Sequence, residues 1–68
     1  MEHTYKHIEI TGSSTESSDQ AVRNAIKKAS ETLRNIHWFE KVSERGFIEG
    51  DAIQYWQVTL KIGFRISD

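Results

Sequence analysis

The most regular pattern of the chain lies near its C-terminus, where apolar and polar residues alternate from Ile53 to Ile66. A period of two places successive side chains on opposite faces of a β-strand. One face of this strand is therefore predicted to be core and the other polar. The strand is long, which predicts that it curves around a neighbouring helix. The predicted core side is Trp56, Val58, Leu60, Ile62, Phe64 and Ile66.

Two other segments show the same alternation and predict two more strands, Tyr5–Thr11 and Phe39–Glu49. Gly12 is expected to end the first of them. Gly50 and Asp51 form a two-residue link of the kind that closes a tight hairpin, with glycine supplying a positive φ. The last two strands are thus predicted to pair antiparallel. In the middle strand, one predicted face is Val42, Glu44, Gly46 and Ile48, and the other is Lys41, Ser43, Arg45, Phe47 and Glu49.

Between the first two strands the apolar spacing changes to three and four residues, which indicates an amphipathic helix. Ser17 followed by Gln20 has the form of a capping box, in which each side chain bonds a backbone N–H of the other residue. The helix is predicted to begin at Ser18 and to end near Asn35. Its apolar stripe is Ala21, Val22, Ala25, Ile26, Ala29, Leu33 and Ile36.

The element order β-α-β-β predicts one α+β domain over residues 1–68, a three-stranded antiparallel sheet wrapped around one helix. The polar face of this sheet is left uncovered. A chain of 68 residues buries only about 60% of its unfolded surface. There is no cysteine for a disulfide, and the three histidines lack the spacing of metal ligands. We therefore expect the chain to be stabilised by self-association.

Composition excludes several classes of function. Nine basic against ten acidic residues give a net charge of -1, so the positive field that attracts nucleic acid or anionic membranes is missing. The absence of cysteine removes thiol and iron–sulfur chemistry. The first residues, Met1–Lys6, lack the apolar stretch of a signal peptide. The sequence predicts a soluble, cytoplasmic protein that binds neither nucleic acid nor membrane.

Four residues suggest a binding site on the open sheet face. Trp38 can stack on a planar ring, and the amide of Gln57 offers a donor and an acceptor to an imide edge. Arg45 and Arg65 can hold a phosphate or carboxylate in the forked geometry of guanidinium. Residues of these types more often have structural roles, so their spacing alone is a weak signal. Trp56 is assigned to the core by its alternation.

No catalytic machinery accompanies these residues. The sequence offers no Ser-His-Asp arrangement, no pair of carboxylates near Trp38 and no cysteine. Nothing is therefore left to make or break bonds in a substrate. The chain is predicted to be a binding protein rather than an enzyme, with no catalytic residues and no metal ligands.

Five blocks of the sequence occur together in an order that resembles one known family. They are Tyr5–Gly12, Ala29–Asn35, Trp38–Glu40, Arg45–Gly46 and Gln57–Phe64. In these blocks the chain resembles the dodecins, which are small flavin-binding proteins, and the resemblance runs over nearly the whole chain. Glu44 and Phe47 depart from the pattern, since an aliphatic and a polar residue respectively are expected there.

The resemblance implies a hollow homododecamer with flavins bound in pairs near two-fold axes, at sites made by more than one subunit. It implies that Trp38 sandwiches the isoalloxazine ring and that Gln57 contacts the polar edge of the ring. It also implies that Arg45 and Arg65 meet the flavin phosphate, which favours FMN over riboflavin. The implied function is flavin binding, storage and photoprotective sequestration, because a stacked tryptophan quenches excited flavin.

Three alternatives remain open at this point. The first is a cage that binds coenzyme A, whose phosphates could meet lysine, arginine and histidine side chains. The second is a purely structural assembly in which Trp38 fills a subunit contact and no ligand binds. The third and weakest is an oxidoreductase that uses the flavin, because a pocket closed by paired tryptophans leaves little room for a substrate.

Overall fold

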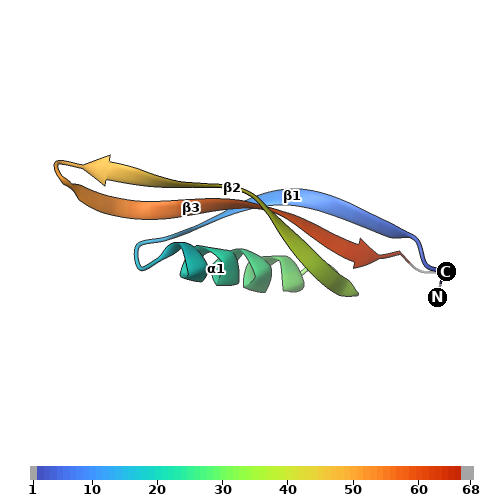
Figure 1. Cartoon of the computed structure of the whole chain (residues 1–68). Coiled ribbons are helices and arrows are strands. Elements are labelled where there is room, and N and C mark those ends of the chain that lie inside the picture. Colours follow the sequence, from blue (N-terminus) through green and yellow to red (C-terminus); the bar gives the residue numbers. More distant parts are fainter. Residues whose placement is uncertain (1, 67–68) are drawn as a thin grey trace.

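The computed structural model describes residues 2–66 and contains one helix and three strands (Figure 1). In chain order these elements are β1 (Tyr5–Ser14), α1 (Ser18–Ser30), β2 (Ile36–Glu49) and β3 (Ala52–Arg65). The strands form one antiparallel sheet in the order β1-β3-β2, and α1 lies against one face of it. The predicted fold, a three-stranded antiparallel sheet with a single helix, is confirmed.

The core lies between α1 and the side of β3 that faces it. Val58, Leu60 and Ile62 are completely buried, as the alternation predicts. Of the other predicted core residues, Trp56 and Phe64 are partly buried, and Ile66 is exposed and lies beyond the end of β3. Opposite the three buried residues are Ala21 and Ala25, whose small side chains allow the helix to lie close to the sheet. Burying each large aliphatic side chain contributes about 1.5–3 kcal/mol. Partly buried residues extend this core: Ile8, Ile10, Ile26, Leu33 and Ile36.

Gly12 does not end β1, which continues to Ser14 in register with β3. A Cβ atom at Gly12 would overlap the carbonyl oxygen of Ala21 and the side chain of Ala25. The glycine is needed because the helix backbone crosses the strand at this point. From the sequence alone, a glycine that permits such a close approach cannot be distinguished from a glycine that ends a strand.

The start of α1 follows the sequence, but only half of the predicted capping box forms. The Oγ atom of Ser17 accepts a hydrogen bond from the backbone N–H of Gln20 at 3.0 Å. The side chain of Gln20 does not reach back to Ser17 and instead donates to Oδ1 of Asn24 at 2.9 Å. The cap therefore rests on the serine oxygen.

The helix ends at Ser30, so the predicted end near Asn35 is wrong. Asn35 has a φ of 61°, a left-handed conformation that asparagine tolerates and that turns the chain back to the sheet. Leu33 and Ile36 still pack against the core, from the turn and from the first residue of β2. Their apolar spacing therefore continued the helical pattern beyond the helix itself.

The strand β2 begins at Ile36, before the predicted start at Phe39, and its pairing with β3 has three irregularities. One of them lies between Lys41 and Ser43 and places Lys41 opposite the buried Leu60. The predicted side of Lys41 is wrong for this reason. At the other end of β2, Gly50 has a φ of 67°, which confirms the predicted hairpin turn.

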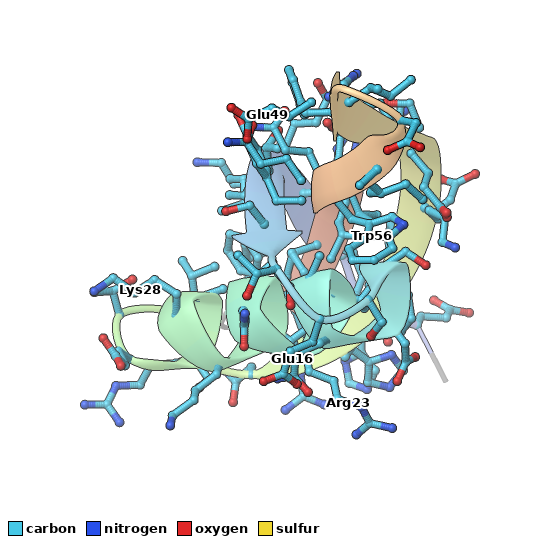
Figure 2. All side chains as sticks on the ribbon, turned by 90° about the vertical axis from the view of Figure 1, so that its left-hand side faces the viewer. Glu16, Arg23, Lys28, Glu49 and Trp56 are labelled. Atoms are coloured by element: carbon cyan, nitrogen blue, oxygen red, sulfur yellow. The ribbon has the colours of Figure 1, made fainter. Side chains whose placement is uncertain are left out.

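The hairpin of β2 and β3 extends beyond β1 and α1 as a two-stranded arm, residues 47–55 (Figure 1). Figure 2 looks from the arm's end, with Glu49 far from the helix and Trp56 beside it. Ile48 and Ile53 on the arm are 75% and 54% exposed. The chain has 5103 Å² of accessible surface, whereas a compact monomer of its mass has about 4,400 Å². The exposed apolar side chains of the arm form part of this surface and favour self-association.

One further property concerns membranes. Within residues 2–66, no helix has the length and apolar character needed to cross a bilayer. The cytoplasmic location stays a prediction.

Candidate functional site

Trp38 reaches the open face of the sheet because of a local irregularity in β2. Plain alternation would place Trp38 on the same side as Ile36, which packs against the core. The pairing register shifts between these two residues, so that Ile36 lies opposite Phe64 and Trp38 opposite Gly63. A bulge of this kind re-aims the next side chain to the other face. His37 is the extra residue that turns Trp38 away from the helix.

The indole of Trp38 lies on the backbone of β3 at Gly63. A Cβ atom at Gly63 would overlap three adjacent ring atoms, Cδ2, Cε2 and Cζ2, so the face of the indole covers this glycine. The Trp38 residue remains 37% exposed. On the neighbouring strand, the His7 ring lies 6.3 Å from the Trp38 ring between centroids, at an angle of 47°. The indole is thus supported on one face by the sheet and accessible from outside.

Gln57 and Arg45 lie opposite each other on β3 and β2, also on the open face. Nη1 of Arg45 donates to Oε1 of Gln57 at 3.4 Å, and Nη2 donates to Oγ of Ser43 at 3.1 Å. The first bond occupies the carbonyl end of the amide. Within residues 2–66 the NH₂ end of Gln57 donates no hydrogen bond, so it is available to donate to a ligand.

The structure does not bring Trp38 and Gln57 together within one chain. Trp38 lies opposite Gly63, and Gly63 is six positions along an extended strand from Gln57, a distance of about 20 Å. The two predicted arginines are also apart, because Arg45 lies opposite Gln57 while Arg65 lies at the far end of β3. Trp38 and Gln57 of one chain therefore lie at opposite ends of the open face.

Paired polar residues cover the sheet between these two ends. The hydroxyls of Thr11 and Thr59 are 2.9 Å apart across β1 and β3. Lys61 on β3 lies between Glu9 on β1 and Glu40 on β2. The open face therefore has a tryptophan end, a charged middle and a glutamine end.

Arg65 accompanies the tryptophan end. It lies two residues from Gly63 on β3, opposite Tyr5, and its Nη1 atom is 3.5 Å from Nε2 of His3. A guanidinium is thus present at each end of the open face, Arg65 beside Trp38 and Arg45 beside Gln57. Within residues 2–66, no three histidine, aspartate or glutamate side chains gather as a metal-binding group.

Glu44 stands where an aliphatic residue is expected, and the structure shows which group stabilises its negative charge. It lies on the helix side of β2, opposite Val58, and accepts a hydrogen bond from Nζ of Lys41 at 2.9 Å. This hydrogen bond and the charge of Lys41 lower the pKa of the Glu44 carboxyl, with a smaller contribution from Ser18 at the start of the helix. The bulge that places Lys41 on this side of the sheet therefore also provides the positive charge that pairs with the Glu44 carboxylate.

Replacing Lys41 by methionine is expected to raise the pKa of Glu44 towards its ordinary value. The folded-state pKa is lowered, so the stabilisation by this pair is present above the ordinary carboxyl pKa and lost as the pH falls through the folded value. An NMR titration of the Glu44 carboxyl carbon measures the shift. Lys61→Met serves as the control and leaves the titration unchanged. An unchanged Glu44 titration in Lys41→Met would contradict this assignment.

Two residues of the tryptophan end were not found by sequence reasoning. Alternation in the sequence leaves Gly63 outside the predicted core side of its strand, and it gives His7 no role at the site. A signal for Gly63 existed, because a glycine in the middle of a strand often marks the close approach of another group. The approaching group, Trp38, could not be identified without the register of β2.

Comparison with known proteins gives consistent matches over the full chain. The family model described as Dodecin matches residues 4–67. The dodecin of Thermus thermophilus is 37% identical over 68 residues, which are 100% of this chain and 99% of that protein. Among solved structures, the dodecin of Streptomyces coelicolor is 50% identical with a TM-score of 0.91, over 97% of this chain and 94% of its own. The dodecin of Streptomyces davaonensis is 48% identical with a TM-score of 0.92, over 100% of both chains.

Solved structures of the T. thermophilus protein include three single-residue variants. These are W38F, R45A and R65A, each with a TM-score of 0.92 to this chain over 98% of its length and at least 98% of their own, at 34% identity. At the numbers 38, 45 and 65 this chain also has tryptophan, arginine and arginine. Three of the four predicted site residues thus have the same type and number as positions chosen for substitution in a relative.

Proposed function

Because the chain belongs to the dodecin family, we propose that it binds flavin, FMN above all, and stores it in a form protected from light. The observation that carries this proposal is the placement of Trp38. Its indole lies with one face against Gly63 and is accessible from the open side of the sheet, which suits stacking on a planar ring.

The proposed site is completed by other copies of the chain. Trp38 and Gln57 of one chain are about 20 Å apart along β3, so a flavin that stacks on one Trp38 takes its edge contact from the Gln57 of a neighbour. Two open faces that meet in opposite directions bring a tryptophan end to a glutamine end. This arrangement supports the proposed homododecamer, in which flavins lie in pairs near two-fold axes.

The proposed role is binding and sequestration rather than catalysis. The residues around Trp38 are His7, Gly63 and Arg65, which include no nucleophile beside a base and no pair of carboxylates. A tryptophan in face contact with excited flavin can donate an electron and take it back, which returns the flavin to its ground state without light emission. Bound flavin is therefore expected to be weakly fluorescent and poorly able to sensitise damage.

Fluorescence titration of FMN, and separately of riboflavin, tests the proposed function. Emission is expected to fall to a plateau near one flavin per chain, while light scattering gives a particle of twelve times the chain mass of 7.9 kDa. Unchanged flavin emission in a protein that forms the large particle would refute flavin storage. Adenine absorbance of the purified protein would then favour the coenzyme A alternative, and the absence of both signals would favour a structural cage.

Replacing Arg65 by alanine is expected to weaken FMN binding while riboflavin binding changes little. A hydrogen bond to a charged group contributes about 1.5–3 kcal/mol, so FMN affinity should fall about 10- to 100-fold. The difference between the two flavins isolates the phosphate, because they share the isoalloxazine ring. The titrations above measure both affinities.

Arg23→Ala is the matched control for charge, because Arg23 lies on α1 and pairs there with Asp19. It removes the same charge from the helix and leaves both affinities unchanged. An equal loss for FMN and riboflavin in Arg65→Ala would show that Arg65 supports the fold of the site and does not meet the phosphate. Arg45→Ala is less selective, since Arg45 also holds Gln57.

A further inference from the structure

We propose that Gly63 is a positioning residue of the flavin site. It sets how close the Trp38 indole lies to the sheet, and thereby the width of the space between this indole and the facing subunit in which the flavin stacks. This inference rests on the proposed function and adds a residue that has no side chain to contact a ligand. What Gly63 contributes is space.

Glycine is required at position 63 because it lacks a side chain, not because of its backbone conformation. Gly63 is buried within β3, and its φ lies outside the left-handed region, so its backbone can be adopted by alanine. The Trp38 indole occupies the place of a side chain here, since a Cβ atom would overlap Cδ2, Cε2 and Cζ2 of the ring. A clash with a ring face cannot be relieved by a small rotation of a flexible chain end.

An added methyl group therefore has to move the indole away from the sheet. The His7 ring, 6.3 Å from the Trp38 ring between centroids, occupies the side towards β1. The added Cβ atom would press on the ring from the sheet side, so it pushes the indole outwards, into the space where the flavin is proposed to stack. Because stacking needs face contact at van der Waals distance, a displaced indole narrows the gap between facing subunits and loses its parallel contact with the ligand.

Gly63→Ala is the direct test, and Gly46→Ala is its matched control. Gly46 is also a strand glycine without a positive φ, but a Cβ atom there would be 3.7 Å from the nearest atom, Cγ2 of Ile53, an ordinary contact. Both substitutions add one methyl group to the sheet. FMN affinity is expected to fall at least tenfold in Gly63→Ala and to stay within twofold of wild type in Gly46→Ala.

A second measurement follows the indole itself, without any ligand. In a Trp56→Phe background Trp38 is the only tryptophan, so its emission maximum and its quenching by acrylamide report where the ring lies. Gly63→Ala is expected to shift this emission to the red and to increase acrylamide quenching, whereas Gly46→Ala leaves both unchanged. A role of Gly63 in strand stability alone would not move these signals in a folded protein.

A double-variant cycle covers the case in which Gly63→Ala folds poorly. If the indole is the obstacle, Gly63→Ala lowers the midpoint of urea unfolding when Trp38 is present and has no such effect in the Trp38→Ala background. An equal loss in both backgrounds would overturn the inference, as would wild-type FMN affinity and emission in Gly63→Ala.

The two proposals fail in distinguishable ways. If flavin storage is wrong, wild type and Gly46→Ala do not quench FMN, yet the emission and unfolding measurements still report on Gly63. If the positioning role is wrong, wild type quenches FMN and Gly63→Ala quenches it equally well.

Discussion

Replacing Trp38 by alanine is expected to weaken flavin binding on the order of 100-fold and to restore flavin fluorescence at concentrations where wild type quenches it. One face of the indole lies on Gly63 and the other is free for a ring. Burial of roughly 100 Å² of apolar surface together with aromatic stacking contributes about 3 kcal/mol. The quenching also disappears because its electron donor is removed. Titration of FMN with the variant measures both effects.

Trp56→Phe is the control that distinguishes the two tryptophans of the chain. Trp56 lies beside the helix, on the side of β3 opposite to the open face (Figure 2). This variant is expected to quench FMN as wild type does. Light scattering shows whether each variant keeps the assembly. Quenching that survives in an assembled Trp38→Ala variant, or is lost in Trp56→Phe, would place the stacking residue elsewhere.

Replacing Leu60 by alanine is expected to lower the free energy of unfolding by about 2–5 kcal/mol. Leu60 is completely buried at the centre of the core, between Val58 and Ile62 along the same face of β3. The lost side chain leaves a cavity, because the strand cannot move towards the helix without breaking its pairing with β1 and β2. For a domain of this size, a loss of that magnitude is a large part of the total stability.

Urea unfolding followed by circular dichroism measures the Leu60 effect, with all samples at one chain concentration because assembly contributes to apparent stability. Lys27→Ala is the control, since it also truncates a long side chain, but on the exposed side of α1. Its effect is expected within about 0.5 kcal/mol. Equal losses in the two variants would show that the core is not centred on β3.

The element order and the core were predictable because local and tertiary preferences agree in those segments. In β3 the alternation around Val58, Leu60 and Ile62 matches a strand with one buried face, and the structure buries those residues completely. Ser17 starts the helix and Gly50 closes the hairpin, and each acts within a few residues of itself. Such short-range signals can be recognised without knowing the rest of the fold.

The end of the helix and the meaning of two glycines were not predictable from spacing. Leu33 and Ile36 share the helical period but reach the core from outside the helix. The sequence pattern predicts that Gly12 ends a strand and that Gly63 lies on the polar face. In the structure Gly12 leaves space for the helix backbone, and Gly63 leaves space for the Trp38 indole. Both errors concern contacts between segments distant in sequence.

The sequence by itself determined the fold class, the buried face of β3 and the residue types of the candidate site, because these depend on composition and on periods of two and three to four residues. The tertiary structure decided on which face of the sheet each site residue lies and which residues surround it. The shift in pairing between Ile36 and Trp38 turns the indole to the open face, and the register of β3 separates Trp38 from Gln57 by about 20 Å. Alternation cannot anticipate a bulge, since a bulge is where alternation is interrupted by strand pairing.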